Sequence, residues 1–387
     1  MSPSAMQGRR MSMSTVPILY DRWFILAAVA IIAIGLMMVA STSIVIADRL
    51  YHQPFHYLVR QIIFLTLGLA CTVMLLRLDT EKLFALSQWL LPVAVLLLCI
   101  VLIPGLGRTV NGSRRWLHLG LFGLQVSELC KLFIFIYLSG YLVRHLAAVQ
   151  ATWSGFIKPM VMLAGIGLLL LLEPDYGAAV VILATALGMF FIAGVRLTRF
   201  SGLFLLILIA FSLLAIASPY RLQRLTTFMN PWANQFDSGY QLTQSLIAFG
   251  RGGWWGVGLG ESVQKLFYLP EAHTDFLFAV MAEELGLLMV LAVIFLYGML
   301  VARGLSIARW AMRQERFFAG FLAYGLSLWI GLQTIINIGV NTGLLPTKGL
   351  TLPLMSYGGS SMLVNCMVLG LLFRIDYENR ITDFGFR

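Results

Sequence analysis

The chain has 387 residues, of which 59% are hydrophobic and 11% are charged, and its formal net charge is +10. Soluble domains carry about 25% charged residues, so this composition excludes an ordinary soluble enzyme and favours a membrane protein. The positive charge does not require nucleic acid, because Lys and Arg accumulate in the cytoplasmic loops of proteins that cross a membrane several times. The four cysteines form no CxxC pair, and we interpret them as small apolar residues.

Residues 1–20 contain Ser, Met, Gly, Pro and the pair Arg9-Arg10, which predicts a disordered cytoplasmic tail. The apolar run after it is too long for a signal-peptide core of about 7–15 residues, so we interpret it as a retained span. A helix needs about 20 apolar residues to cross a bilayer. The sequence therefore predicts an all-α, polytopic membrane protein with ten transmembrane helices, at residues 23–47, 57–76, 89–104, 129–146, 159–173, 177–195, 201–218, 274–302, 318–343 and 361–374.

These spans define a membrane domain at 21–376, with a large extracytoplasmic loop at about 219–273 between spans seven and eight, and a cytoplasmic tail at 377–387. Ten spans place both termini on one side. That side holds more Lys and Arg, including four Arg in the loop 303–317, so we expect it to be cytoplasmic. The outer segments are basic too, which suits either lipid phosphates at the membrane surface or an anionic substrate.

Charged residues cluster between the third and sixth spans. Arg115 follows Asn111-Gly112, a turn signal, in "VNGSRRWLHLG". In "SELCKLFIF", Glu128 and Lys131 are three residues apart and share a helix face. They form either a local ion pair or part of a polar pocket, in which Lys131 holds a phosphate or lowers the pKa of a nearby acid. The sequence "EPDYG" (173–177) predicts a tight outer turn that caps the sixth helix.

Two glycine-containing stretches have both structural and anion-binding interpretations. "GRGGWWGVGLG" (250–260) is either a compact loop with Trp at the membrane interface or a nest of backbone amides that, with Arg251, accepts a phosphate. "GLLPTKGLTLPLMSYGGSSM" (343–362) contains Lys348 and opens the last span. There Ser360 is either an N-cap or part of an anion site at the N-terminus of the helix.

The stretch "HTDFLFAVMAEELG" (273–286) is rich in acids, although the whole chain has only 17 Asp and Glu. Asp275 falls in the first turn of a predicted span, where the helix dipole favours a carboxylate. An ionised carboxylate costs about 2.5–3.5 kcal/mol at mid-depth, and ionisable groups in spans usually face a cavity and carry function. At about 100° per residue, Glu283 and Glu284 do not form the carboxylate pair of a glycosidase with Asp275. We expect them to pair with basic or polar groups of neighbouring helices.

The order and spacing of these motifs resemble one family, the FtsW/RodA/SpoVE proteins of bacterial shape, elongation, division and sporulation. The resemblance rests on "LPEAHTDFLFAVMAEELG", on "NTGLLPTKGLTLPLMSYGGSS" and on "VNGSRRWLHLG" followed by "QVSELCKL", and it extends from the first span to residue 374. The pair Thr347-Lys348 resembles the FtsW branch more than the RodA branch. Two positions depart from the family pattern: Val126, where relatives usually have Pro, and Phe267, where relatives often have a charged residue.

This resemblance implies a ten-span peptidoglycan glycosyltransferase. Such an enzyme polymerises lipid II, an undecaprenyl-pyrophosphate-linked disaccharide-pentapeptide, on the outer face of the bacterial inner membrane, here at the division septum. The resemblance implies that Asp275 is the essential acid, that Glu128 and Lys131 lie in a polar cavity, and that Lys348 acts in the loop before the last span. The implied partners are a class B penicillin-binding protein transpeptidase, divisome regulatory proteins and membrane lipid, with no nucleic acid.

We therefore expect glycosyl transfer with Asp275 as the general base. The expected substrate-binding residues, whose cations would offset charge on the pyrophosphate, are Lys131, Glu128, Arg251, Lys348, Arg115 and Ser360. No organic cofactor is expected, and a divalent cation, Mg or Mn, is left open because no ligand cluster in the sequence specifies one. The alternatives are a lipid II flippase and a divisome scaffold. The titratable residues gather at the outer face, whereas a flippase needs a polar path to both sides.

Overall fold

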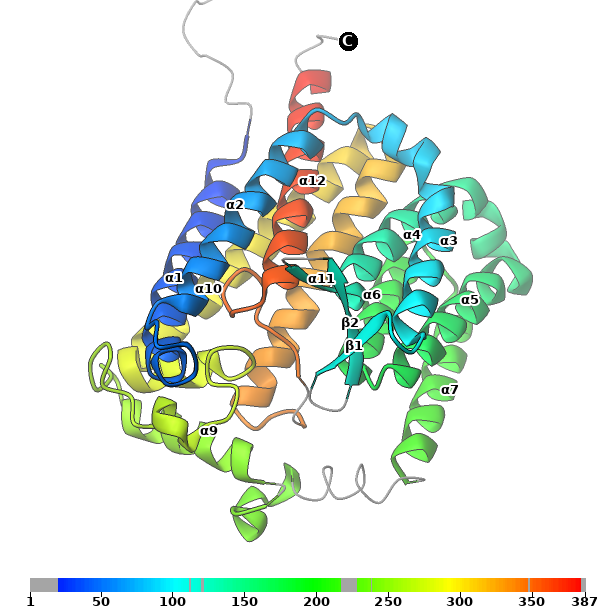
Figure 1. Cartoon of the computed structure of the whole chain (residues 1–387). Coiled ribbons are helices and arrows are strands. Elements are labelled where there is room, and N and C mark those ends of the chain that lie inside the picture. The colour runs from blue at the N-terminus through cyan, green and yellow to red at the C-terminus, as the bar shows by residue number, and fades with distance from the viewer. Residues whose placement is uncertain are drawn as a thin grey trace, which may run out of the picture.

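The computed structural model describes residues 20–110, 113–119, 122–216, 228–237, 239–346 and 349–383. Its helices are α1 (Arg22–Tyr51), α2 (His56–Leu76), α3 (Thr80–Leu102), α4 (Val126–Ala151), α5 (Trp153–Leu172), α6 (Tyr176–Ile192), α7 (Leu197–Ile216), α9 (Tyr240–Gly252), α10 (Leu277–Arg313), α11 (Phe317–Asn341) and α12 (Gly359–Asp383). Figure 1 also shows strands β1 (Gly107–Val110), β2 (Ser113–Leu119) and β3 (Phe122–Gln125), and the short helical turns are η1 (Pro231–Asn234) and η2 (Gln264–Tyr268).

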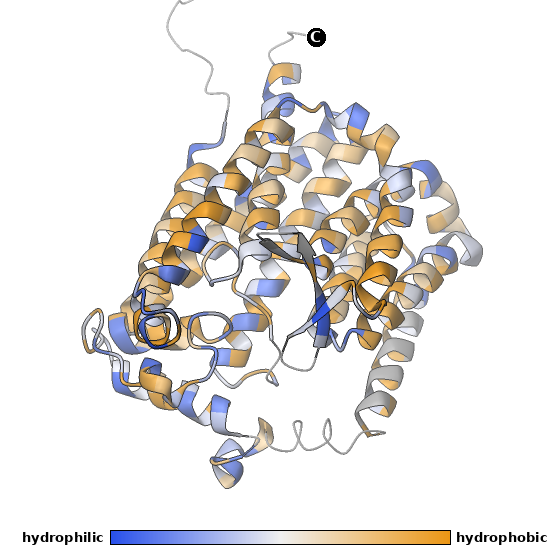
Figure 2. Cartoon of the chain, viewed as in Figure 1, coloured by the Kyte–Doolittle hydropathy of each residue, from blue (hydrophilic) through white to orange (hydrophobic). Residues whose placement is uncertain are grey.

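The predicted fold class, a helical membrane protein, is confirmed, and each of the ten predicted spans overlaps a helix. Within the described ranges, eight helices are long and apolar enough to cross a membrane, namely α1–α5 and α10–α12, and α6 is a shorter apolar helix. Figure 2 shows apolar residues along the helices and hydrophilic residues at their ends and in the connections. The count of ten crossings and the extent of the outer loop stay predictions, and the loop as described from residue 228 onward contains η1, α9 and η2.

The two ends of the described chain lie together at one end of the helix bundle. Asp21 is the N-cap of α1, because its carboxylate accepts from the amides of Trp23 and Phe24, both at 3.0 Å. Its own amide donates to the Asp376 carboxylate of α12 at 2.7 Å. The described chain therefore begins and ends on the same side of the bundle, which fits an even number of crossings (Figure 1).

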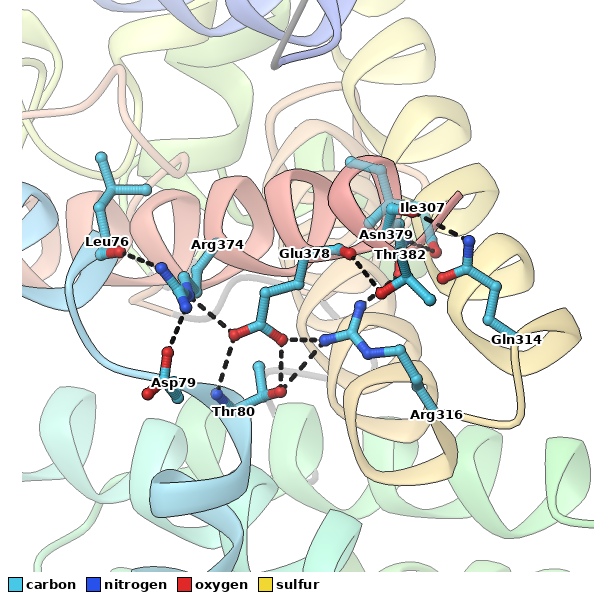
Figure 3. Close-up of polar contacts among 10 residues, drawn as sticks. All are labelled: Leu76, Asp79, Thr80, Ile307, Gln314, Arg316, Arg374, Glu378, Asn379 and Thr382. Atoms are coloured by element: carbon cyan, nitrogen blue, oxygen red, sulfur yellow. Dashed lines mark hydrogen bonds and ion pairs between the residues drawn. The ribbon is translucent and has the colours of Figure 1, made fainter. Parts of the chain in front are cut away.

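The last helix continues beyond the span expected at 361–374 and occupies much of the expected tail at 377–387. Glu378 and Asn379 are buried, since α12 runs on to Asp383. Figure 3 shows the reason: the Glu378 carboxylate accepts from Thr80 Oγ1 at 2.6 Å and from Arg374 Nε at 2.8 Å, and it pairs with Arg316. This network fastens α12 to the α2–α3 and α10–α11 turns, so the helix is stabilised past the apolar stretch that the sequence revealed.

A three-stranded antiparallel sheet, ordered β1-β2-β3, joins the far ends of α3 and α4 and was not predicted. Its register pairs Arg108 with Trp116 and Trp116 with Gln125. The first two strands contact α3, and β3 contacts α12. The amide of Gln125 donates to Ser360 Oγ at 2.8 Å, which attaches the sheet to the start of α12 at the end of the bundle opposite the termini.

The glycine-rich stretch 250–260 supplies backbone hydrogen bonds at an interruption of helix α10. At Gly286 the backbone leaves the helical conformation, with φ 74° and ψ −177°. The carbonyls freed at Glu283 and Glu284 accept from the amides of Val257 and Gly258, both at 3.0 Å. Because these amides are occupied by backbone carbonyls, the interpretation of the stretch as a phosphate nest is wrong for them, and the compact-loop interpretation is supported.

We expect Gly256→Ala to destabilise the protein. A Cβ at this position would lie 2.1 Å from the carbonyl oxygen of Glu284, and the residue has φ 79°, which costs an L-residue about 1–2 kcal/mol even without a clash. The measurement is thermal unfolding of the detergent-purified protein. Gly250→Ala is the matched control, because no atom lies within 4 Å of a Cβ built there. Equal unfolding temperatures for the two variants would contradict this role of the close backbone contact.

Candidate functional site

Asp275 lies in the turn between η2 and α10 rather than in the first helical turn, because α10 begins at Leu277. Its side chain is half-buried. The backbone carbonyl of Asp275 accepts from two side-chain amides of α11, Asn337 Nδ2 at 3.0 Å and Asn341 Nδ2 at 2.9 Å. The turn also meets the segment before α12, since a Cβ on Gly349 would lie 3.1 Å from the Asp275 carboxylate. Two distant parts of the chain thus fix the position of this acid.

Arg115 of β2 brings the α5–α6 turn into the same region. Its Nε donates to the carbonyl of Glu173 at 3.1 Å, and another nitrogen donates to the carbonyl of Pro174. Its Nη1 lies 4.0 Å from the carboxylate of Asp175. Asp175 caps α6, as predicted for this turn, by accepting from the amide of Ala178 at 3.2 Å. The sequence interpretation missed that the turn also contributes acids to the site.

The charges around Asp275 oppose one another. The pKa of Asp275 is raised to about 7, first by burial and then by the negative charge of Glu271 and Asp175, while Arg115 acts to lower it. The carboxyl group therefore titrates near neutral pH, where a general base is most effective. Glu173 is a second unusual acid here: it is fully buried, neither of its carboxylate oxygens has a hydrogen-bond partner, and burial raises its pKa to about 8.

Glu128 and Lys131 form the predicted ion pair, at 2.9 Å, and the lysine is fully buried. Lys131 Nζ also donates to Gln333 Oε1 at 3.0 Å and lies 5.0 Å from the ring centroid of Trp329. Gln333 Nε2 in turn donates to the carbonyl of Thr351 at 3.0 Å. The pair therefore connects α4 through α11 to the segment that contacts Asp275, while direct contact of Lys131 with substrate stays a prediction.

Three other predicted substrate-binding residues have different outcomes. Arg251 pairs with Glu283 at 3.0 Å, and its substrate role stays a prediction. Ser360 is buried, and its hydroxyl bonds the amide of Gln125 and the carbonyl of Gly123. It is not an N-cap, because α12 already begins at Gly359. Lys348 lies outside the described residues.

The prediction that Glu283 and Glu284 pair with neighbouring elements is confirmed. Glu283 binds Arg251 of α9 and the hydroxyl of Ser262, whereas Glu284 binds Lys265 of η2 at 2.7 Å. Glu284 also accepts from Ser41 of α1 at 2.7 and 2.8 Å. These contacts attach the segment 251–265, which precedes Asp275, to the helix that follows it.

The acids of the site do not form a cluster typical of a metal centre. Within the described ranges, no three His, Cys, Asp or Glu side chains are grouped closely enough to hold an ion. We therefore derive no chemical step through a metal, and a divalent cation bound together with a pyrophosphate stays a prediction.

Comparisons with known proteins agree over nearly the whole chain. A family model described as "Cell cycle protein" (FtsW/RodA/SpoVE) matches residues 21–381. The "Probable peptidoglycan glycosyltransferase FtsW" of Legionella pneumophila is 58% identical over 100% of this chain and 98% of its own length. The protein of the same name from Coxiella burnetii is 55% identical over 94% of this chain and 98% of its own length.

Two solved structures share the fold. A chain from a study of "polymerization and crosslinking by a peptidoglycan synthase complex" has a TM-score of 0.78 and 30% identity, covering 94% of this chain and 99% of that chain. The rod shape determining protein RodA of Thermus thermophilus has a TM-score of 0.69 and 29% identity, covering 94% of this chain and 98% of that one.

Proposed function

The chain belongs to the FtsW/RodA/SpoVE family of cell cycle proteins, and on this premise we propose that it is a peptidoglycan glycosyltransferase that polymerises lipid II into glycan strands. One observation carries the assignment of the site: Asp275, an acid that titrates near neutral pH, is held in a turn within the electrostatic reach of Arg115. A positioned carboxylate that is partly ionised at neutral pH is suited to take a proton from a sugar hydroxyl.

In the proposed reaction, Asp275 accepts the proton of the C4 hydroxyl on the acceptor sugar while that oxygen attacks the anomeric carbon of the donor. The bond from the anomeric carbon to the lipid pyrophosphate breaks, and the pyrophosphate leaves with the bonding electrons. Arg115, whose charge acts on Asp275, is the predicted binding residue that offsets negative charge on the leaving group in this proposal. The proton on Asp275 returns to solvent before the next cycle.

The active end of the bundle faces the periplasm in this proposal, and both termini are cytoplasmic. The end with the termini carries Arg303, Arg316, Arg374 and Arg380, which agrees with the excess of cationic residues on cytoplasmic faces. The likeness to a chain of a peptidoglycan synthase complex supports a penicillin-binding protein partner. Action at the division septum with divisome proteins is part of the proposal, and it fits the description of the family as cell cycle proteins.

The test is polymerisation of defined, labelled lipid II by the purified chain, alone and with a class B penicillin-binding protein. Glycan strands that require the chain support the glycosyltransferase. Movement of lipid II across vesicle membranes without polymer would instead identify a flippase. If polymer also forms in the absence of this chain, and the chain only stimulates the partner transpeptidase, the protein is a scaffold.

We expect Arg115→Gln to move the acid limb of the pH–rate profile to higher pH. The arginine lowers the pKa of Asp275, so its removal raises that pKa and leaves less ionised base at neutral pH. The measurement is the initial polymerisation rate between pH 5.5 and 9, with buffers overlapping at each step. Arg108→Gln is the control, since Arg108 is an exposed arginine of the same sheet. An unshifted acid limb in Arg115→Gln would contradict the electrostatic contact.

A further inference from the structure

A side chain of α11 takes part in the first main-chain turn of α10. Ala279 is in the first turn of α10, where the backbone amides have no carbonyl of residue i−4 within the helix to donate to. Instead, the amide of Ala279 donates to Asn341 Oδ1 at 3.1 Å, and Asn341 Nδ2 donates to the carbonyl of Asp275 at 2.9 Å. The Ala279 amide also contacts the carbonyl of Phe276, at 3.0 Å. The carboxamide of Asn341 is thus inserted between the Ala279 amide and the Asp275 carbonyl.

A second asparagine, one helical turn earlier, completes the arrangement. Asn337 Nδ2 donates to the carbonyl of Asp275 at 3.0 Å and to the carbonyl of Leu350 at 2.6 Å. Asn341 Nδ2 also lies 2.9 Å from the carbonyl of Asn337. Both asparagines are buried, at 2% and 0% exposure, so water does not replace these bonds. Through them α11 joins the turn of Asp275 to the segment at 349–352.

Only a carboxamide can serve at position 341 without loss. A carboxamide has an acceptor oxygen and an NH2 donor on one planar group. The oxygen accepts from the Ala279 amide, and the NH2 group donates to the Asp275 carbonyl. Aspartate, the same size, retains the acceptor but has no donor when ionised. Alanine has neither, so the Ala279 amide would keep only the Phe276 carbonyl, and the Asp275 carbonyl would keep only the amide of Asn337.

We propose that Asn341, assisted by Asn337, is a positioning residue for glycosyl transfer, because its inserted amide holds the backbone of Asp275 in the turn before α10, with the carboxyl beside Gly349 and within reach of Arg115. This inference rests on the proposed function, in which Asp275 is the base. The positioning does not require either asparagine to touch substrate. Loss of the insertion is expected to lower kcat more than it raises KM, because a misplacement of about 1 Å can cost about 100-fold in rate.

The experiment compares Asn341→Asp, Asn341→Gln and Asn341→Ala in the full chain bound to its transpeptidase partner, with lipid II as substrate. Alanine and aspartate are expected to lower kcat about 100-fold with KM changed less than about 3-fold. Glutamine, which retains donor and acceptor on a longer side chain, is expected to retain more activity than aspartate. If position 341 were purely structural, the variant closest in size to asparagine, which is Asn341→Asp, would retain the most activity.

Asn379→Ala is the matched control, because Asn379 is a buried asparagine at the opposite end of the bundle, bonded to Ile307 and Arg316 (Figure 3). It is expected to reduce thermal stability while kcat stays within about 3-fold of wild type. The pH profile separates the two: in Asn341→Ala the carboxyl of Asp275, which faces Glu271, Asp175 and Arg115, loses burial, so the acid limb moves to lower pH. Asn379→Ala leaves it in place.

A wild-type kcat and a wild-type pH profile in Asn341→Asp would overturn the inference. It would also be overturned if the variants at positions 341 and 379 lost kcat in the same proportion to their loss of thermal stability. If Asn341→Asp does not accumulate, Asn337→Asp removes the donor to the Asp275 and Leu350 carbonyls and is judged by the same readouts. An inactive Asp275→Asn combined with a fully active Asn341→Asp refutes the positioning role alone. A fully active Asp275→Asn refutes the proposed base, and the positioning role with it.

Discussion

Replacing Asp275 with Asn is expected to lower lipid II polymerisation about 100- to 10,000-fold while the protein still folds. Asparagine has nearly the same shape, so it occupies the same place beside Gly349, but it cannot accept the proton of the acceptor hydroxyl. Loss of a positioned general base costs a factor of this size. The measurement is the single-turnover and steady-state rate of glycan formation by the chain in complex with its partner.

The control for this variant is Asp48→Asn. Asp48 is an exposed acid of α1, near the same end of the bundle, so the control repeats the change of charge without touching the site. Thermal unfolding of both variants should match that of the wild type to within a few degrees. Polymerisation by Asp275→Asn at the wild-type rate would show that another group takes the proton, whereas slow polymerisation in both variants would trace the effect to net charge.

The spans and the charged pair could be predicted from the sequence because their signals are local. Runs of apolar residues specify a spanning helix by length and composition alone, and Glu128 with Lys131 share a helix face by spacing alone. The ends of helices were less predictable. The end of α12 is set by Glu378 and Arg316, and the second of these belongs to a turn far away in the sequence.

The three-stranded sheet was missed although one signal was present. The dipeptide Asn111-Gly112 is a typical sequence signal for a two-residue hairpin turn, and in the sequence it falls between β1 and β2. The strands that flank it are only four and seven residues long, so they contribute little to a search for hydrophobic runs. Recognising the hairpin would have placed Arg115 on a strand and suggested that it reaches over to a neighbouring helix end.

The partners of the candidate site could not be predicted, because they depend on contacts between distant segments. Nothing near Arg251 in the sequence indicates that it pairs with Glu283, and nothing in "HTDF" indicates that α11 supplies two amides to its backbone. A weak signal existed for the latter: Asn337 and Asn341 are four residues apart on a largely apolar helix, and polar residues on one face of a span usually have a function.

Replacing Lys131 with Met is expected to reduce the free energy of unfolding by about 3–5 kcal/mol. The lysine is fully buried, and its loss leaves the carboxylate of Glu128, which is also buried, without its cation. One oxygen of that carboxylate has no hydrogen-bond partner even in the native protein. The measurement is unfolding of the detergent-purified variant, and wild-type stability would contradict the view that the pair is a closed internal contact.

The double variant Glu128→Gln with Lys131→Met separates the structural role of the pair from a role in binding substrate. Removing both charges avoids an isolated buried carboxylate, so most of the lost stability is expected to return. Polymerisation by this stable double variant then tests the predicted contact of Lys131 with pyrophosphate. A rate that stays at least tenfold low, with a raised KM for lipid II, supports that contact. A wild-type rate contradicts the contact of Lys131 with pyrophosphate. The role of the pair is then to position Gln333 and, through it, the segment that contacts Asp275.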